Sequence, residues 1–449
     1  MLNLTFYGGV GEIGGNKILL EHNKTKIFFD FGMSFSKAGE YFTDYLQPRN
    51  VNGVADYLEF GLLPSLKGLY SKELLLHTSI KYQKPIYDGV FISHVHIDHI
   101  GDIWAIDENI PIYCGETTKL IMEAMEESGN MDYGEHNYKT FRTGRKIRIG
   151  KITIEPIHVD HSVPGAYGFI IYTKDGNIVY TGDLRIHGSA SELTKDFLRK
   201  AKKAKPNIMI CEGTKVSTSK KEYNTSEDDV YEKSFEIVSK TSKLVIATFY
   251  GRDIDRFYTF YNVAKENKRK FVISMKLANL INKLKDDLKL RMPNVFKDKN
   301  ILIYKRRKRS GEYEENDYSK WERPYLQNSV GADYIHKHQS ELILNLDFTN
   351  FTELIDIRPD KGSHFIHSMS EPFSEEDIEA DIMDKWIKHF GLIFHQLHAS
   401  GHCTKKQIMN IIKDINPKVL FPIHTQHPEL FKGVCEKVIL PEINKAYRL

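Results

Sequence analysis

Short apolar runs dominate roughly the first half of the chain. NLTFYGG (3–9), NKILLEH (16–22) and TKIFFDFG (25–32) are β-rich and are separated by glycine and polar turns, so they predict consecutive strands. Further strands are predicted at 87–94, 110–115, 145–159, 167–173, 177–183 and 206–213. Helical spacing of apolar residues predicts helices at 116–128 and 190–204. This excess of strands indicates packed sheets covered on the outside by helices.

The pattern changes after about residue 215. Helical stretches there alternate with buried-looking strands such as KLVIATFY (243–250) and KFVISM (270–275), which is typical of a second, α/β-type unit. Residues 391–433 predict a strand, a histidine-rich turn, an amphipathic helix and a further strand. A chain of 449 residues also exceeds the size at which a single core stops growing, about 250 to 300 residues. We therefore expect two domains.

Composition and charge restrict the classes of protein. The chain is 41% hydrophobic and 27% charged, which suits large cores, and its net charge of +3 is too small for binding nucleic acid through bulk charge. A local groove would have to bind any nucleic acid. The run YKRRKRSGEYEEND (304–317) is basic and then acidic, and two interpretations stay open: a solvated loop whose charges cancel, or a rim that guides a polyanion.

The cysteines and the apolar segments of the sequence bear on the cellular compartment. The four cysteines form no C-x-x-C pair, which favours a reducing cytoplasm over a disulfide framework. The start of the chain does not resemble a signal peptide, and no run of about 18 apolar residues occurs, so we expect a cytoplasmic protein without a membrane span. The glycine cluster GGVGEIGG (8–15) is expected to form a strand turn near the active face, since it lacks the G-K-[ST] of a phosphate loop.

The stretch SHVHIDHIGD (93–102) carries the clearest chemistry. It follows the apolar strand GVFIS, and in an extended chain His94 and His96 point the same way, toward one metal ion. Asp98 and His99 project in a different direction and can hold a second ion close to the first. The H-x-H-x-D-H spacing therefore predicts a site for two cations.

This motif resembles that of metallo-β-lactamase-fold hydrolases, whose fold is a four-layer αββα sandwich. The resemblance implies three more ligands, each after a strand: His161 in HVDHSVPGAYGF, preferred over His158, then Asp183 in VYTGD and His424 in PIHTQHPE. The first ion would be held by His94, His96 and His161, the second by Asp98, His99 and His424, with Asp183 bridging both. Zinc suits this imidazole-rich set best, and manganese stays an alternative.

Further motifs are similar to those of the β-CASP nucleases, and of ribonuclease J-like proteins in particular. Glu212 in IMICEGTK and the segment HASGH (398–402) correspond to catalytic positions of that group, and Ser370 lies in an S-x-SEPF segment. The implied domains are a metallo-β-lactamase domain at 1–215 and 386–449 and an inserted α/β β-CASP domain at 216–385. Where bacterial members have TFASNIYRI, this chain has TFYGRDIDRF (248–257), in which Arg252 is a candidate phosphate contact.

The resemblance assigns roles to these residues. Glu212 would accept an N–H from a ligand histidine, and His402 would contact the scissile phosphate and protonate the leaving oxygen. The catalytic residues are thus expected to be His402, Asp98 and Glu212. The expected substrate-binding residues are His398, Ala399, Ser400, Gly401, His402, Arg252 and Ser370.

The implied activity is hydrolysis of single-stranded RNA, as a 5′-to-3′ exonuclease that prefers a 5′-monophosphate, with endonuclease activity beside it. The chain resembles the short forms that lack a C-terminal domain, and a homodimer stays open. Three alternatives remain: an endonuclease only, a metallo-hydrolase of a non-RNA substrate, and an inactive scaffold, against which the full ligand set argues.

Overall fold

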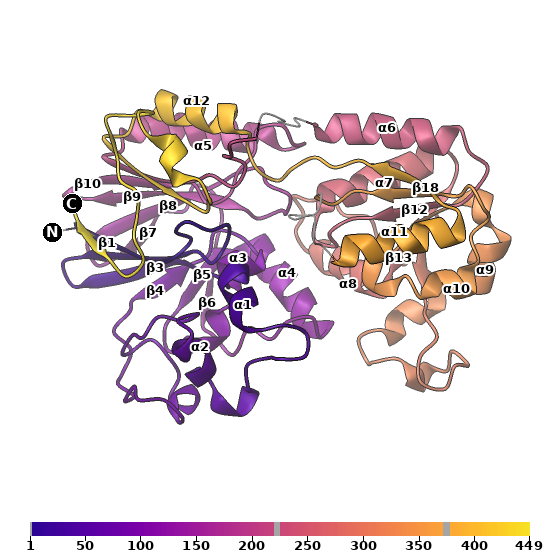
Figure 1. Cartoon of the computed structure of the whole chain (residues 1–449), viewed down its shortest axis with the longest axis horizontal. Coiled ribbons are helices and arrows are strands. Elements are labelled where there is room, and N and C mark those ends of the chain that lie inside the picture. The colour runs from indigo at the N-terminus through magenta and orange to yellow at the C-terminus, as the bar shows by residue number, and fades with distance from the viewer. Residues whose placement is uncertain (1, 220–224, 371–377) are drawn as a thin grey trace.

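The computed structural model describes residues 2–219, 225–370 and 378–449. In this part of the chain the strands form three sheets of seven strands each (Figure 1). Two of the sheets face each other and the third stands beside them, as the second unit expected from the sequence. None of the helices in the described ranges has the length and apolar character that crossing a membrane requires.

The first sheet begins with antiparallel hairpins and continues with parallel strands. β1 pairs with β2 and β2 with β3 in antiparallel fashion, whereas β3, β4, β5 and β6 run parallel. In sheet order its strands are β21 (Ala446–Arg448), β1 (Leu2–Gly8), β2 (Lys17–His22), β3 (Thr25–Phe31), β4 (Gly89–Phe91), β5 (Ile112–Gly115) and β6 (Tyr138–Phe141). The last strand of the chain thus pairs with the first.

The second sheet also mixes both pairings. Its order is β20 (Lys437–Val438), β19 (Val419–Ile423), β11 (Ile208–Glu212), β10 (Gly176–Tyr180), β9 (Tyr167–Thr173), β8 (Ile152–His158) and β7 (Ile147–Ile149). The single strand expected at 145–159 is two strands, because Gly150 adopts a positive φ of 54° and turns β7 back onto β8. β19 comes from the late part of the chain and lies beside β11.

Aromatic side chains fill the space between these two sheets. Phe169 on β9 contacts Phe29 on β3 and Phe91 on β4, with ring centroids 5.4 and 6.0 Å apart, and all three are buried. Alternation along β4 places Phe91 in this inner core and Val90 in the outer one.

Helices cover both outer faces of the pair of sheets. α4 (Glu116–Glu127) packs its apolar face on the first sheet, and α5 (Ser191–Ala204) and α12 (Lys405–Ile415) pack on the second. The helices expected at 116–128 and 190–204 are thereby confirmed, as is the four-layer αββα sandwich (Figure 1). Shorter helices on the first sheet's side are α1 (Phe35–Tyr41), α2 (Ala55–Glu59) and α3 (Ile97–Ile100).

The third sheet is entirely parallel and belongs to the segment between β11 and β19. Its order is β15 (Ser329–Val330), β14 (Ile301–Tyr304), β13 (Lys270–Ser274), β16 (Leu342–Asn345), β12 (Val245–Thr248), β17 (His364–His367) and β18 (Ile393–Gln396). β18 lies beyond residue 385, the expected domain boundary, and pairs with β17, so the third sheet extends to Gln396.

Helices cover both faces of the third sheet. One face carries α6 (Glu227–Ser239), α7 (Ile254–Glu266) and α8 (Met275–Leu284), and the other carries α9 (Ala332–Lys337), α10 (Glu353–Ile357) and α11 (Ile378–Phe390). Short 3-10 turns occur at Asn50–Asn52, Glu73–Leu75, Ile103–Ala105, Glu315–Asp317, Arg323–Asn328, Gln339–Glu341, Phe348–Asn350 and Pro428–Phe431.

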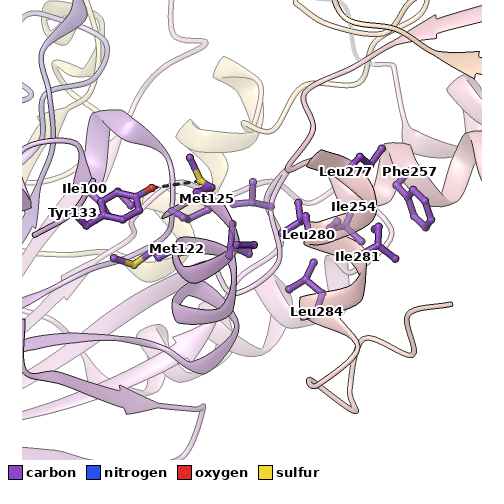
Figure 2. Packing of buried hydrophobic residues seen from close by; sticks show 14 of the residues in the cluster. Ile100, Met122, Met125, Tyr133, Ile254, Phe257, Leu277, Leu280, Ile281 and Leu284 are labelled. Atoms are coloured by element: carbon purple, nitrogen blue, oxygen red, sulfur yellow. Dashed lines mark hydrogen bonds between the residues drawn. The ribbon is translucent and has the colours of Figure 1, made fainter. Parts of the chain in front are cut away.

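One apolar core is continuous between the sandwich and the inserted unit. Met122 and Met125 on α4 lie opposite Leu280, Ile281 and Leu284 on α8, as Figure 2 shows, and all belong to a single buried cluster. The two units therefore share buried surface, which favours a fixed relative orientation over free hinge motion.

Replacing Phe169 by alanine tests the inner core. We expect Phe169→Ala to lower the free energy of unfolding by about 3 to 5 kcal/mol, because a large cavity forms between the two sheets. The measurement is urea unfolding followed by circular dichroism. Leu193→Ala on α5, where the side chain is 40% exposed, is the control and should change the stability by about 0.5 kcal/mol or less. Equal effects of the two substitutions would contradict this account of the core.

Candidate metal centre

The structure brings the seven candidate ligands together at one edge of the sandwich. His94 and His96 follow β4, and Asp98 and His99 lie on α3 directly after them. His161 follows β8, Asp183 follows β10 and His424 follows β19. Each side chain thus comes from the loop or short helix after a strand, where residues distant in sequence can meet.

Asp183 belongs to all three groups of potential metal ligands among the described residues. Two of them hold the seven candidate ligands: His94, His96, His161 and Asp183 in one, and Asp98, His99, Asp183 and His424 in the other. The third group is Asp183, Glu212 and His402, and within each group one ligand atom per residue lies within 4.8 Å of the others. Asp183 Oδ2 is 3.1 Å from His99 Nε2, 3.6 Å from His94 Nε2 and 3.7 Å from His424 Nε2. A carboxylate in this position can serve two cations at once.

Hydrogen bonds on the outer side of the rings determine which nitrogen faces the centre. His99 Nδ1 lies 2.8 Å from Asp30 Oδ2, and His161 Nδ1 lies 2.6 Å from the carbonyl oxygen of Gly401. Both partners are acceptors, so each Nδ1 carries a proton and each Nε2 is the nitrogen that faces the centre and is available to a metal ion.

His94 and His96 complete this arrangement. Ser93 Oγ donates to Asp30, so it accepts from His94 Nδ1 at 3.0 Å, which leaves His94 Nε2 toward the centre. His96 presents Nδ1 instead, 3.0 Å from His94 Nε2 and 3.1 Å from His161 Nε2.

Asp30 was not among the residues predicted from the sequence. Its buried carboxylate accepts from Ser93, His99 and the hydroxyl of Tyr180, and its backbone adopts a left-handed φ of 55°. A non-glycine residue in that region is strained and is retained where the surroundings demand it. The only signal in the sequence was a lone acid at the end of the apolar run KIFFD.

The electrostatics divide the histidines into two sets. Burial, together with neighbouring rings, lowers the pKa of His94 and His96 well below the usual value and that of His161 to about 3. Burial also opposes the charge of His99 and His424, but the carboxylates of Asp183 and Asp98 outweigh it, raising the pKa of His99 strongly and that of His424 to about 9.

This donor set fits divalent cations. His96 Nδ1 lies about 3 Å from both His94 Nε2 and His161 Nε2, where only a proton or a shared cation relieves the repulsion between the lone pairs of these neutral rings. In the other group, protonated imidazoles compensate the negative charge of the two aspartates. A bound metal ion would supply this positive charge instead, and the imidazoles would then be its neutral ligands. The imidazole and carboxylate ligands thus support the use of divalent metal.

Glu212 contacts a different histidine from the one expected. Its carboxylate lies 3.1 Å from Nδ1 of His402, a predicted catalytic residue, and accepts from the backbone N–H of Leu184 at 3.0 Å. It reaches a candidate ligand only indirectly: Thr214 Oγ1 donates to Glu212 at 2.8 Å and lies 2.8 Å from His424 Nδ1. The expectation of a direct bond to a ligand histidine is therefore wrong, because Thr214 occupies the space between.

The loop 398–402 is held through its carbonyl groups. Arg256 Nη2 donates to Ala399 O at 3.0 Å, His187 Nε2 lies 2.9 Å from Ser400 O, and Gly401 O bonds to His161. A Cβ on Gly401 would lie 2.8 Å from His161 Cε1, so the loop can approach this imidazole only with glycine there. These contacts orient His402 relative to Asp183.

A buried ion cluster anchors this loop to both units. Arg185, after β10 of the sandwich, bonds to Asp160 at 3.1 Å and to Glu227 of α6 at 2.7 Å. Arg256 of α7 bonds to the same Glu227 at 2.9 Å, and both arginine side chains are 0% exposed. Burial raises the pKa of Glu227 to about 7, against the lowering effect of the two guanidinium groups. None of these four residues was identified from the sequence.

Arg252 and Ser370 lie on the side of the inserted unit. Arg252 Nη1 donates to the carbonyl oxygen of Val95 at 3.3 Å, between His94 and His96, and its charge contributes to the low pKa of His96. The hydroxyl of Ser370 lies 2.9 Å from that of Tyr250. Residues 371–377, which contain the rest of the SEPF segment, lie outside the described residues. Substrate contact by Arg252 and Ser370 stays a prediction.

The histidines left out of the ligand set lie elsewhere. His158 stacks on Tyr167 with centroids 4.1 Å apart, and His427 contacts Glu429 at 3.2 Å. Of the two histidines His158 and His161, only His161 therefore belongs to a metal-ligand group.

Comparison with protein families supports the assignment of a metal centre to these residues. Residues 68–214 match the beta-lactamase superfamily domain, and residues 393–430 match the Zn-dependent metallo-hydrolase RNA specificity domain. The second match contains the loop 398–402 and His424.

Curated relatives match almost the whole chain. Ribonuclease J of Helicobacter pylori is 24% identical over 95% of this chain and 56% of its own length. Ribonuclease J of Mycoplasma genitalium is 24% identical over 93% of this chain and 67% of its own length, and that of Thermus thermophilus is 23% identical over 98% and 73%. The chain thus spans little more than half the length of the Helicobacter relative.

A solved structure covers the whole fold. A protein of unknown function from Enterococcus faecalis V583 is 25% identical, and the match covers 100% of both chains with a TM-score of 0.80. The fold, the site and these matches together define a metallo-β-lactamase-fold protein with an inserted β-CASP domain. More particularly, the chain is similar to ribonuclease J over almost its whole length.

Removal of the shared carboxylate tests the metal centre. We expect Asp183→Ala to lose most of the bound divalent metal, because each ligand group loses its common oxygen donor. The measurement is metal content after dialysis, by atomic emission, on protein loaded with zinc or manganese. Asp44→Ala, on an exposed loop residue, is the control and should retain the content of the unaltered protein. Full metal content in the Asp183 variant would contradict the bridging position.

Removal of Arg256 tests the buried ion cluster. We expect Arg256→Met to lower the free energy of unfolding by about 3 to 5 kcal/mol, because Glu227 and the carbonyl of Ala399 lose a buried charged partner. Arg199→Met breaks a surface ion pair with Asp196 and should cost about 1 kcal/mol or less. Urea unfolding measures both variants, and a cost for Arg256→Met as small as that of the surface pair would contradict the role of the cluster.

Proposed function

We propose that the protein is a metal-dependent ribonuclease that hydrolyses phosphodiester bonds of single-stranded RNA. The proposed mode is 5′-to-3′ exonucleolytic cleavage from a 5′-monophosphate, with internal cleavage as a second activity. The observation that carries the proposal is the convergence of His402 and Glu212 with Asp183, the residue common to both ligand groups. The similarity to ribonuclease J over 95% of the chain supports RNA as the substrate.

The proposed metal ions are two, held by His94, His96, His161 and Asp183 and by Asp98, His99, Asp183 and His424. Divalent ions at these positions supply Lewis acidity toward phosphate oxygens and the attacking water. Zinc is the proposed metal, because five of the seven ligands are imidazoles.

The chain's own residues hold and orient the reacting groups. Glu212 accepts the Nδ1 proton of His402, and this leaves Nε2 of His402 to contact the scissile phosphate and to protonate the leaving oxygen. The carbonyl bonds at 399–401 keep this imidazole beside Asp183. Arg252 and the residues of the 398–402 loop are the proposed contacts of the remaining phosphate oxygens.

Cleavage assays on end-labelled RNA test the proposal. Single-stranded RNA of about 20 nucleotides, labelled at either end and carrying a 5′-monophosphate, triphosphate or hydroxyl group, is incubated with the zinc- or manganese-loaded protein. We expect mononucleotides to be released from the 5′ end, fastest with the monophosphate. Internal fragments alone would indicate an endonuclease, and intact RNA with full metal occupancy would contradict the proposal.

Variants of His402 separate its role from metal binding. We expect His402→Ala to lower kcat about 10²- to 10⁴-fold while metal content stays unchanged, because a proton donor is lost and no ligand is removed. His338→Ala is the control, since His338 lies in the inserted unit and contacts Glu341. Unchanged kcat in the His402 variant would contradict its proposed role.

A further inference from the structure

A cleft of about 520 Å³ is lined by residues of the inserted unit and by Ser128 at the end of α4 of the sandwich, and none of its lining residues belongs to the metal centre. Its floor contains Ser274, Tyr304 and Asn345, which are the last residues of the neighbouring parallel strands β13, β14 and β16. In open parallel sheets, ligands bind outside the carboxyl ends of the strands. The position in the fold therefore already suits a small ligand.

Three cations line this cleft. Lys276 lies in the first turn of α8, and Arg306 and Lys308 come from the basic run after β14. They are close enough that, besides burial, the charges of Arg306 and Lys308 lower the pKa of Lys276. Like charges held together in this way attract an anion.

The acidic half of the same run does not line the cleft. Asp317 accepts from the backbone and hydroxyl of Ser310 within its own loop, and Glu312, Glu314 and Glu315 are exposed. The sequence left two interpretations of the run 304–317 open. Cancellation of its charges within the run does not apply to Arg306 and Lys308, because these two side chains line the cleft and the acids of the run do not.

Aromatic rings form another part of the lining. Tyr304 and Tyr318 are 5% and 1% exposed, and the half-buried Trp321 lies beside them in the lining. The ring of Tyr318 also lies beneath Lys308 Nζ, which is 5.7 Å from its centroid. Aromatic faces next to cations are the surface on which nucleic-acid bases stack while their phosphates are bound.

Polar groups that suit a ribose are present as well. Asn345 is buried at the end of β16, and Asp347 follows it with a carboxyl group whose pKa is raised by burial despite the nearby charge of Lys276. A second acid, Glu322, already bonds to Lys308 at 2.5 Å. In α/β nucleotide sites, an acid near the strand ends accepts hydrogen bonds from ribose hydroxyls.

We propose that this cleft binds a ribonucleoside 5′-phosphate: the phosphate on Lys276 and Arg306, the base against Trp321, and the ribose at Asp347. The same chemistry is offered by a free nucleotide and by one nucleotide of a bound RNA strand. If the bound nucleotide is part of an RNA strand, the proposal rests on the proposed function. If it is a free nucleotide, the proposal is independent of that function.

Titration of the metal-loaded full-length chain with AMP tests the site. Calorimetry measures the affinity, and tryptophan fluorescence reports on the cleft, since Trp321 is one of three tryptophans. We expect Lys276→Ala combined with Arg306→Ala to weaken AMP binding about 10- to 100-fold, because two charge-assisted hydrogen bonds are lost. Adenosine, which lacks the phosphate, should bind the unaltered protein about 10-fold or more weakly than AMP.

A matched control comes from the same basic run. Arg309 bonds to Asn316 O and does not line the cleft, so Arg309→Ala should leave AMP affinity within about 2-fold. Trp321→Leu is a second, uncharged variant and should also weaken AMP binding without loss of the circular dichroism spectrum. Correctly folded cleft variants that bind AMP and RNA as the unaltered protein does would overturn the proposal.

The source of the nucleotide is decided by a parallel titration with 20-nucleotide single-stranded RNA in a His402→Ala background. Weaker RNA binding in the cleft variants supports an RNA strand, and weaker AMP binding with unchanged RNA binding supports a free nucleotide. Cleavage of a trinucleotide by the cleft variants, with His402 intact, should equal that of the unaltered protein. A protein that binds AMP but cleaves no RNA would contradict the proposed function and leave the cleft proposal standing.

Discussion

The burial of Asp183 among imidazoles is the constraint on which the rest of the site depends. A carboxylate 2% exposed is costly unless charge and hydrogen bonds compensate it, and here the ring nitrogens of several histidines surround one of its oxygens. Each ring must present the correct nitrogen, and in His94, His99, His161 and His424 a partner on the outer nitrogen fixes that choice. Asp30, Ser93, Thr214 and the carbonyl of Gly401 are those partners.

This requirement links the two units of the molecule. The carbonyl that orients His161 lies in a loop whose neighbouring carbonyls are held by Arg256 of the inserted unit and by His187 of the sandwich. Glu227 connects Arg256 to Arg185, so the loop, the sandwich and α6 share one buried charge cluster. The apolar contact of α4 with α8 keeps the units in place around it (Figure 2).

The metal centre and the cleft of the inserted unit follow the same structural rule. Both place polar side chains after the carboxyl ends of strands, where the backbone leaves a sheet edge and side chains from separate loops converge. They differ in charge: the first collects carboxylates and imidazoles, which suits cations, and in the second Lys276, Arg306 and Lys308 outnumber the acids Glu322 and Asp347, which suits an anion. A chain of small net charge thus contains two sites of opposite preference.

The sequence by itself determined most of the sandwich strands, its helices at 116–128 and 190–204, and the candidate ligands His94, His96, Asp98 and His99, because alternation and the H-x-H-x-D-H spacing are local properties of the backbone. Resemblance to a known family was needed for His161, Asp183 and His424, which lie far from that motif. Only the tertiary structure decided the partners: Glu212 with His402 across 190 residues, and His161 with Gly401 across 240. Pairs of this kind leave no local pattern, since each depends on where two distant loops end. The same reason explains why Asp30 and the Arg185–Glu227–Arg256 cluster were missed, and why the pairing of β18 with β17 extended the third sheet.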